Sequence, residues 1–402
     1  MWTALAGSVK AEEETLKIAA VVTAYYHNSH ADVIVSRLLE GYNLNEKAPY
    51  PRMRLASLYV DQFPENDKSR ELARKHRFPI FDSVAGALTL GGDTLAVDGV
   101  LLVAEHGTYP ESETGSIMYP KRRLFGEIVD VFNRSHRVVP VFSDKHLADN
   151  WQDAKWIYDT AKERGIPLMA GSSLPVLWRR PPARIERGEE VQEIVAVSYH
   201  RLDTYGFHAL EMVQTLAEQR GAGETGIAHV QCLEGAAVWD AASAGVYDRK
   251  LLAEALGKLP RQLWGKRTIE AAAHNPVLFA IEHRDGLKVN VLTLNGAVGE
   301  WATAWRLADG ATKSTCFETQ EARPFTHFEH LLRGVEQMMH SGKPTWPVER
   351  TLLTTGALDA LLRSRHAGGK PLDTPWLQIE YQSPWQWHQP PEPAESRPLT
   401  GQ

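Results

Sequence analysis

The chain has 402 residues, which is too long for one ordinary hydrophobic core, so we expect two domains. With 43% hydrophobic residues, 23% charged residues and a formal net charge of −6, it has neither the basic excess of a nucleic-acid binder nor the polar bias of a disordered chain. No run reaches the roughly 18 apolar residues of a membrane-spanning helix, and the first fifteen residues lack the pattern of a secretory leader. We predict a cytoplasmic protein that binds a small molecule and neither nucleic acid nor membrane. An exported form whose leader has been removed remains an alternative.

The N-terminal half alternates short apolar runs with amphipathic stretches. Strands are expected at residues 18–22, 55–60, 99–104, 138–142 and 167–170, and helices at 31–39, 124–133 and 147–164, with a helix that closes into a short return at 71–81. Strands that alternate with helices are typical of a doubly wound parallel sheet, whose ligands bind outside the carboxyl ends of the strands. We therefore predict an α/β protein in which a lead-in at 1–15 precedes a Rossmann-like, nucleotide-binding-type domain at 16–180.

A run rich in proline and arginine at 178–184 ends this pattern, because consecutive prolines continue neither a helix nor a central strand. Longer strands follow at 191–199, 226–233, 277–282, 287–294, 301–307 and 376–381, with helices at 208–219, 325–341 and 350–365. They predict an α+β domain at 181–382 with a largely antiparallel open sheet, for substrate binding and oligomerisation. The tail at 383–402, rich in Pro, Gln and Glu, is expected to be disordered or to act as an arm.

The first turn of the N-terminal domain lacks the glycines that let main chain touch a pyrophosphate. It runs from Val22 to His30 and contains two tyrosines and two histidines. The acidic residue that ends the second strand, Asp61, is present. The turn therefore either binds a dinucleotide through an altered set of residues or no longer binds one. If a dinucleotide binds, its contacts are expected from Ala24, Tyr25, Asp61 and Glu105.

Four local motifs, in this order of elements, resemble the Gfo/Idh/MocA family. They are His30-Ala31 after the turn, Asp61, Asp144-Lys145-His146-Leu147 in place of the family's Glu-Lys-Pro-Leu, and residues 204–211 in place of its Asp-x-Gly-x-His-x-x-Asp. The resemblance covers nearly the whole chain. It departs from the family at Val22, Ala24 and His27, which stand where the three glycines would be.

The resemblance implies an NAD(P)-dependent oxidoreductase that acts at a carbinol carbon of a sugar, cyclitol or related polyhydroxylated compound. In the family a lysine and a histidine flank the nicotinamide and assist proton transfer, which assigns these roles to Lys145 and His208. A lysine beside a cationic ring and away from water can have a lowered pKa and so take part in acid–base chemistry near neutral pH. The expected catalytic residues are Lys145, His208, Asp144 and His200, and the expected substrate contacts are Tyr109, Arg122, Tyr199 and Glu211.

A second interpretation comes from histidines and carboxylates that follow neighbouring strands. These residues are His27, His30, Glu105, His106 and His146. Imidazole and carboxylate together suit Mn, Zn, Fe or Ni, and an open coordination position would make a Lewis-acid site. The alternative function is an NAD-independent, metal-dependent lyase or hydrolase.

A third class, a non-catalytic ligand sensor or assembly protein, would explain the missing glycines but not the retained lysine. Open antiparallel sheets in the family commonly pair across subunits, so the resemblance also implies a homodimer or homotetramer.

Overall fold

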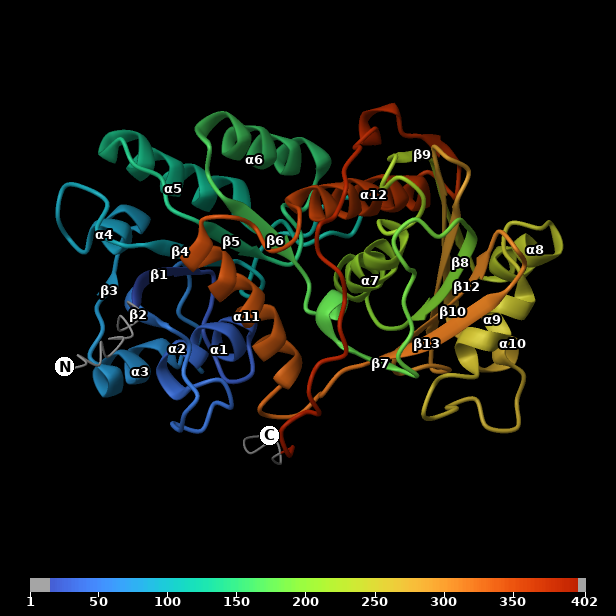
Figure 1. The fold of residues 1–402 in the computed structure, drawn as a ribbon, viewed down its shortest axis with the longest axis horizontal. Helices are drawn as coiled ribbons and strands as arrows, with labels where there is room; N and C mark the ends of the chain where they lie inside the picture. Colours follow the sequence, from blue (N-terminus) through green and yellow to red (C-terminus); the bar gives the residue numbers. More distant parts are fainter. Residues whose placement is uncertain (1–14, 397–402) are drawn as a thin grey trace, which may run out of the picture.

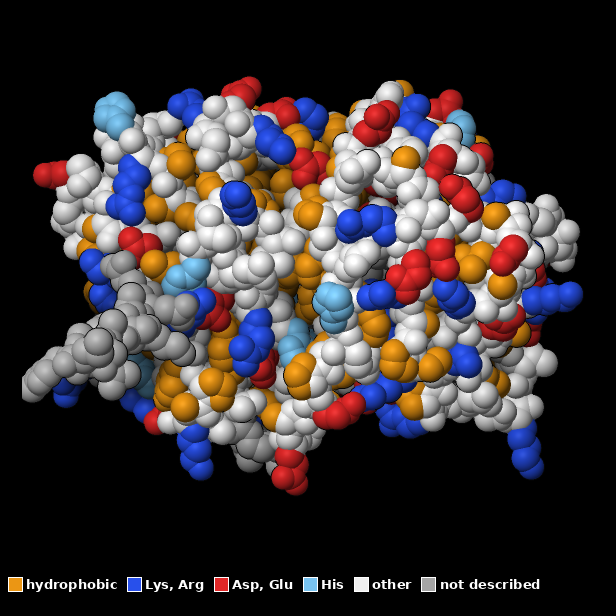
Figure 2. Space-filling view, in the orientation of Figure 1, with side chains coloured by type: hydrophobic (Ala, Val, Ile, Leu, Met, Phe, Trp, Pro, Cys, Tyr) orange, Lys and Arg blue, Asp and Glu red, His pale blue; other side chains and the backbone are white. Residues whose placement is uncertain are grey.

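The computed structural model describes residues 15–396, so all of the predicted lead-in except its last residue, and the last six residues of the tail, lie outside the described residues. Two sheets lie side by side, each with helices packed on it (Figure 1). Within the described residues, no helix is long and apolar enough to cross a bilayer. On the face shown in Figure 2, acidic and basic side chains are interspersed rather than gathered into a patch of one sign.

The N-terminal sheet has six parallel strands in the order β3-β2-β1-β4-β5-β6. The strands are β1 (Leu16–Val22), β2 (Met53–Val60), β3 (Ile80–Phe81), β4 (Gly99–Val103), β5 (Val141–Asp144) and β6 (Leu168–Gly171). The helices of this half are α1 (His30–Val35), α2 (Arg37–Glu40), α3 (Ser69–His76), α4 (Val84–Thr89), α5 (Lys121–Ser135) and α6 (Trp151–Arg164). The predicted doubly wound sheet is confirmed. Its central strands are buried on both faces, which is why they read as continuous apolar runs.

The predicted first helix is interrupted at Ser36, between α1 and α2. The Ser36 hydroxyl donates to Asp32 Oδ1 at 2.8 Å and lies 2.7 Å from the Tyr25 hydroxyl. These contacts fix the break directly beneath the first turn, so no long helix starts at the place where a dinucleotide-binding fold has one.

The second sheet has eight strands in the order β14-β9-β10-β11-β8-β12-β13-β7, antiparallel except for the β11 and β8 pair. The strands are β7 (Trp178–Arg180), β8 (Val191–Ser198), β9 (Ile227–Glu234), β10 (His274–His283), β11 (Lys288–Asn295), β12 (Trp301–Leu307), β13 (Thr312–Glu318) and β14 (Leu372–Asp373). Helix α7 (Phe207–Ala217) and helix α12 (Val348–His366) pack on one face, and α8 (Ala236–Ser243), α9 (Arg249–Leu256) and α10 (Ile269–Ala272) on the other. The predicted largely antiparallel domain is confirmed. The predicted strand at 376–381 is wrong, because a 3₁₀ turn at Pro375–Leu377 occupies its start.

Two late helices tie the halves together. Helix α11 (Thr326–Ser341) packs into the core beneath β1 and β4, and α12 contributes side chains to the cores of both sheets. The tail packs as well. Trp387 is 7% exposed and donates through Nε1 to the Leu177 carbonyl at 2.7 Å, so the prediction of disorder is wrong for residues 383–396.

Candidate active site at the strand ends

A buried ion cluster lies where β4 and β5 end. The Glu105 carboxylate forms ion pairs with Lys121, the first residue of α5, and with Lys145, the residue after β5, at 3.0 Å for the latter. Lys121 also donates to the main-chain carbonyls of Asp144 and His146, at 2.7 and 2.6 Å. All three charged side chains are at most 6% exposed. One buried carboxylate is therefore shared by two ammonium groups.

Lys145 is held in a left-handed backbone conformation, with φ +50°, while its amide donates to the Gly171 carbonyl at 3.1 Å. Non-glycine residues adopt this conformation rarely, and such residues cluster at functional sites. Burial alone would lower the pKa of Lys145, but the charges of Glu105 and Asp144 outweigh burial and raise its pKa. The expectation that Lys145 has a lowered pKa is therefore wrong. Lys145 is an ammonium at neutral pH and acts as a hydrogen-bond donor or acid rather than as a base.

His208 enters the same region from α7 of the second domain. Its Nδ1 atom lies 2.5 Å from the hydroxyl of Ser172, which follows β6. Burial, followed by the positive charge of Lys145, lowers the pKa of His208 well below its usual range. Its Nε2 atom has no hydrogen-bond partner within residues 15–396. His208 is thus a neutral imidazole with an open nitrogen beside a fixed ammonium.

His30 and Asp144 form a second acid–base element. His30 Nδ1 lies 2.5 Å from Asp144 Oδ2, and the carboxylate is 1% exposed. The His30 ring also contacts the rings of His106 and Phe328, with centroids 5.2 and 5.0 Å away. A carboxylate bonded to Nδ1 orients the imidazole ring. We call Glu105, Lys145, His208, His30 and Asp144 the strand-end site.

Aromatic rings lie beside the His208 end of the strand-end site, where Tyr199 and Tyr205 are partly exposed and Trp301 is buried behind them. Tyr205 stacks on Trp301 with centroids 5.5 Å apart, and Trp301 also contacts Tyr199 and His208. His200 is exposed but lies over the Tyr205 ring at 4.6 Å. The structure therefore places the predicted Tyr199 and His200 in the aromatic wall beside His208. This wall suits the apolar face of a sugar or cyclitol ring.

Glu211, a predicted substrate contact, lies behind the site. Its carboxylate accepts hydrogen bonds from Thr354 at 2.8 Å and from the Ser172 amide at 3.4 Å, and burial raises its pKa. A Cβ at Gly171, where φ is +123°, would stand 2.5 Å from this carboxylate. Glu211 is 1% exposed and supports the Ser172 segment, so it is not placed to touch a substrate.

The predicted metal cluster is not assembled. His27 faces away toward Asp32 at 3.8 Å, and His146 is hydrogen-bonded through Nε2 to the Asp203 carbonyl at 2.8 Å. Burial and nearby cations lower the pKa of His106 to about 3. Within residues 15–396, the one group of three His, Cys, Asp or Glu whose ligand atoms lie within 4.8 Å of one another is Glu40, Glu46 and His76, far along the chain from the strand ends.

The residues predicted to bind a dinucleotide do not fit one. Tyr25 is fully buried and bonded to Ser36, and Ala24 is 2% exposed, so both side chains lie in the core. Asp61 follows β2 as predicted, but its carboxylate already accepts from Tyr59 and Tyr109, each at 2.7 Å, and pairs with Arg123 at 2.5 Å. The carboxylate that would bind the ribose is thus engaged within the chain, and we assign no step to a dinucleotide.

Arg122, a predicted substrate contact, points away from the site. It pairs with Asp153 at 2.6 Å, stacks over Trp156 at 4.9 Å and is half exposed. Tyr109 is bound to Asp61 rather than free for a substrate.

Sequence reasoning missed Lys121 and the role of Ser172. Lys121 stands at the first position of a helix among three basic residues, a pattern typical of a solvated turn, and no local signal marks it as buried. Ser172, which follows β6, is hydrogen-bonded to His208, and no motif in the sequence marks it for that role.

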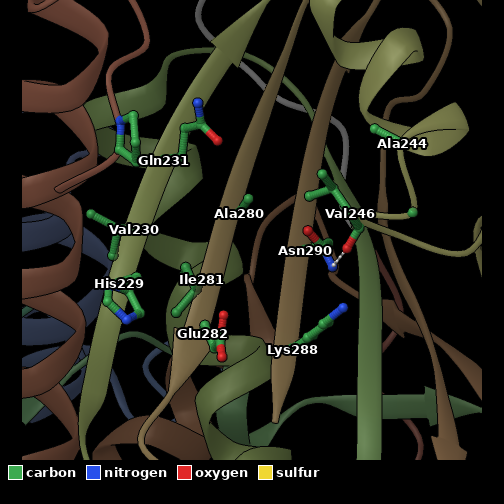
Figure 3. A pocket seen from close by; sticks show the side chains of 12 residues that line it. His229, Val230, Gln231, Ala244, Val246, Ala280, Ile281, Glu282, Lys288 and Asn290 are labelled. Atoms are coloured by element: carbon green, nitrogen blue, oxygen red, sulfur yellow. Dashed lines mark hydrogen bonds between the residues drawn. The ribbon is translucent and has the colours of Figure 1, made fainter. Parts of the chain in front are cut away.

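A separate hollow lies on the outer face of the second sheet, among β9, β10, β11 and the turn after α8 (Figure 3). Its only histidine, His229, is paired with Asp373 at 2.6 Å, and Asn290 donates to the Val246 carbonyl at 3.2 Å. This hollow offers none of the acid–base pairs found at the strand ends.

No family model and no curated protein matches the chain. Solved structures do. GenD2 from gentamicin A biosynthesis in complex with NAD aligns over 90% of this chain and 96% of its own, with a TM-score of 0.56 at 14% identity. A putative myo-inositol dehydrogenase from Sinorhizobium meliloti 1021 (TM-score 0.54, 12% identity, 89% and 99% covered) and apo scyllo-inositol dehydrogenase from Lactobacillus casei (0.53, 10%, 90% and 98%) align as well.

These structures have the domain organisation that the sequence motifs predicted, and they align over nearly their full length. The chain therefore shares its two-domain fold with these solved structures.

Proposed function

We propose that this chain is an enzyme of the oxidoreductase fold described above that acts on a polyhydroxylated small molecule, with Lys145 and His208 as its proton-transfer pair. The observation that carries the proposal is the pairing of a fixed ammonium with a neutral imidazole contributed by the other domain. Two groups held in opposite protonation states by their surroundings are what acid–base catalysis requires.

Lys145 and His208 act on the same hydroxyl group of the substrate. The open Nε2 of His208 accepts the hydroxyl proton, while the Lys145 ammonium donates a hydrogen bond to the same oxygen and stabilises the negative charge that develops there. Glu105 keeps Lys145 charged, and Ser172 holds the His208 ring. The aromatic wall of Tyr205 and Trp301 positions the ring of the substrate.

The substrate class follows from the wall, the proton-transfer pair and the structural neighbours, which include inositol dehydrogenases. Oxidation at a carbinol carbon requires loss of one hydroxyl proton and one hydride. The chain's own residues account for the proton. One neighbour was crystallised with NAD, but Asp61 of this chain is engaged within the chain, so we propose the proton transfer at the hydroxyl and no hydride step.

A second candidate is proton transfer without nicotinamide, such as isomerisation or elimination on a keto-sugar. The His30–Asp144 pair favours it, because an imidazole oriented by a buried carboxylate is a general base independent of any cofactor. The metal-dependent form of this alternative lacks an assembled ligand set. Cytoplasmic location and assembly into a homodimer or homotetramer remain predictions.

The test is ligand-observed NMR on the purified protein with myo-inositol, scyllo-inositol and glucose as probes. Binding by the wild type, lost in Lys145→Met and His208→Ala and retained in the matched control Arg122→Met, supports the proposal. Equal binding by all variants would place the substrate elsewhere.

A further inference from the structure

We propose that Tyr109 and Arg123 occupy the subsite in which this fold holds the ribose of a dinucleotide, so that the protein works without NAD or NADP. The inference goes beyond the proposed function, because it concerns Asp61 and the first turn rather than Lys145 and His208. Either can fail without the other.

The Asp61 carboxylate is saturated by the chain itself. Oδ1 accepts from Tyr59 at 2.7 Å and from Arg123 at 2.5 Å, and Oδ2 accepts from Tyr109 at 2.7 Å. Burial would raise the pKa of Asp61, but these donors outweigh burial and lower it. In dinucleotide folds the corresponding carboxylate binds ribose hydroxyls. Here a ribose would have to displace the side chains of Tyr109 and Arg123 from Asp61.

The segment that carries Tyr109 is hydrogen-bonded to Gln62, just after the end of β2. Gln62 accepts from the Thr108 amide at 2.8 Å and donates to the Thr108 carbonyl at 3.0 Å. Gly107 has φ +121°, and a Cβ there would stand 2.7 Å from the Tyr109 ring and 2.9 Å from Gln62. The Tyr109 ring also packs edge-on against Tyr119, with centroids 5.6 Å apart. Several independent contacts therefore hold Tyr109 on Asp61.

The phosphate end of the site is closed by different residues. The Asn28 amide donates to Asp32 Oδ2 at 2.9 Å, and the Asp32 amide donates to the Ser29 hydroxyl at 3.2 Å. These are amides of the turn and first helix on which a pyrophosphate would rest. Asp32 is fully buried and pairs with Lys68 at 2.7 Å and with Arg323 at 2.9 Å.

Asp32 adds a charge of the wrong sign for a pyrophosphate. Burial opposes its ionisation, but Arg323 and Lys68 lower its pKa to about 2, so it is a carboxylate at neutral pH. A pyrophosphate at this turn would meet a fixed negative charge whose counter-ions are already used. Side chains of the protein therefore occupy both ends of the dinucleotide site. Tyr109 and Arg123 bind the carboxylate that would hold the ribose, and the Asp32 and Ser29 side chains bind the amides that would hold the pyrophosphate.

The direct test is titration of the desalted full chain with NAD⁺, NADH, NADP⁺ and NADPH, followed by native mass spectrometry and calorimetry. We expect no stoichiometric complex, with any dissociation constant weaker than about 1 mM, a free energy of only about −4 kcal/mol. Stoichiometric binding in the micromolar range that is lost in Asp61→Ala would overturn the inference.

A second measurement tests the closure without any ligand. Hydrogen exchange at the amides of residues 107–109 is expected to accelerate in Tyr109→Phe and in Arg123→Met. Glu127→Gln is the matched control, because Glu127 is the exposed second partner of Arg123 at 2.9 Å and does not touch Asp61. Unchanged exchange in Tyr109→Phe would show that its hydroxyl does not hold the segment on Asp61 and would overturn the closure.

Discussion

Glu105→Gln is predicted to destabilise the N-terminal domain strongly. The substitution keeps the shape of the side chain but removes the one negative charge between Lys121 and Lys145, which are 1% and 6% exposed. Removing one partner of a buried ion pair costs about 3–5 kcal/mol, because the remaining charge stays buried without compensation. Glu105 serves two lysines, so the upper part of that range is expected. At about 2–4 °C for each kcal/mol, the melting temperature falls by roughly 6–20 °C.

Urea unfolding and differential scanning calorimetry at pH 7 measure this loss, with the exposed Glu127→Gln as the control, expected within about 0.5 kcal/mol of the wild type. The pKa of Lys145 gives a second readout. Since the Glu105 charge raises it, Glu105→Gln lowers it, and competitive acylation of Lys145 becomes faster near neutral pH. A free energy of unfolding within about 1 kcal/mol of the wild type would refute the buried cluster.

The remaining predictions concern other parts of the molecule. Because the pKa of folded Asp61 is lowered, its contribution to stability is present above its unfolded pKa and is lost as the pH falls through the folded value. The difference in urea midpoint between the wild type and Asp61→Asn therefore shrinks from pH 6 to pH 3, and a constant difference would contradict it. Gly171→Ala costs about 1–3 kcal/mol in chemical unfolding, because of φ +123° and the approach to Glu211; a neutral effect would contradict that geometry. Sedimentation velocity is expected to show a dimer or tetramer, and a monomer would exclude the predicted assembly.

Much of the fold is predictable because its signals are local. The buried strands β1 and β4 contain continuous apolar runs, and the prolines after Trp178 end the first pattern. Strand β7, at the edge of the second sheet, and its neighbour β13 were missed, because neither short sequence shows an apolar alternation. The break at Ser36 depends on Tyr25 and Asp32, which only the folded chain brings together.

The position of the site could be predicted from the sequence, but the ion pairs within it could not. The rule that parallel strands end at one edge placed Glu105, Lys145 and His30 together correctly. It could not foresee that a second lysine, Lys121, arrives from α5 and neutralises Glu105, or that the Glu105 charge keeps Lys145 protonated. These outcomes depend on burial and on pairs distant in sequence, which spacing does not encode.

The central claim is that a polyhydroxylated ligand binds between Lys145 and His208. The most direct measurement is saturation-transfer NMR of myo-inositol, scyllo-inositol and glucose with the wild type, Lys145→Met and the Arg122→Met control. The account predicts that at least one of these probes binds the wild type and the control but not Lys145→Met. Binding that survives unchanged in Lys145→Met, or no binding of any probe to the wild type, would contradict it.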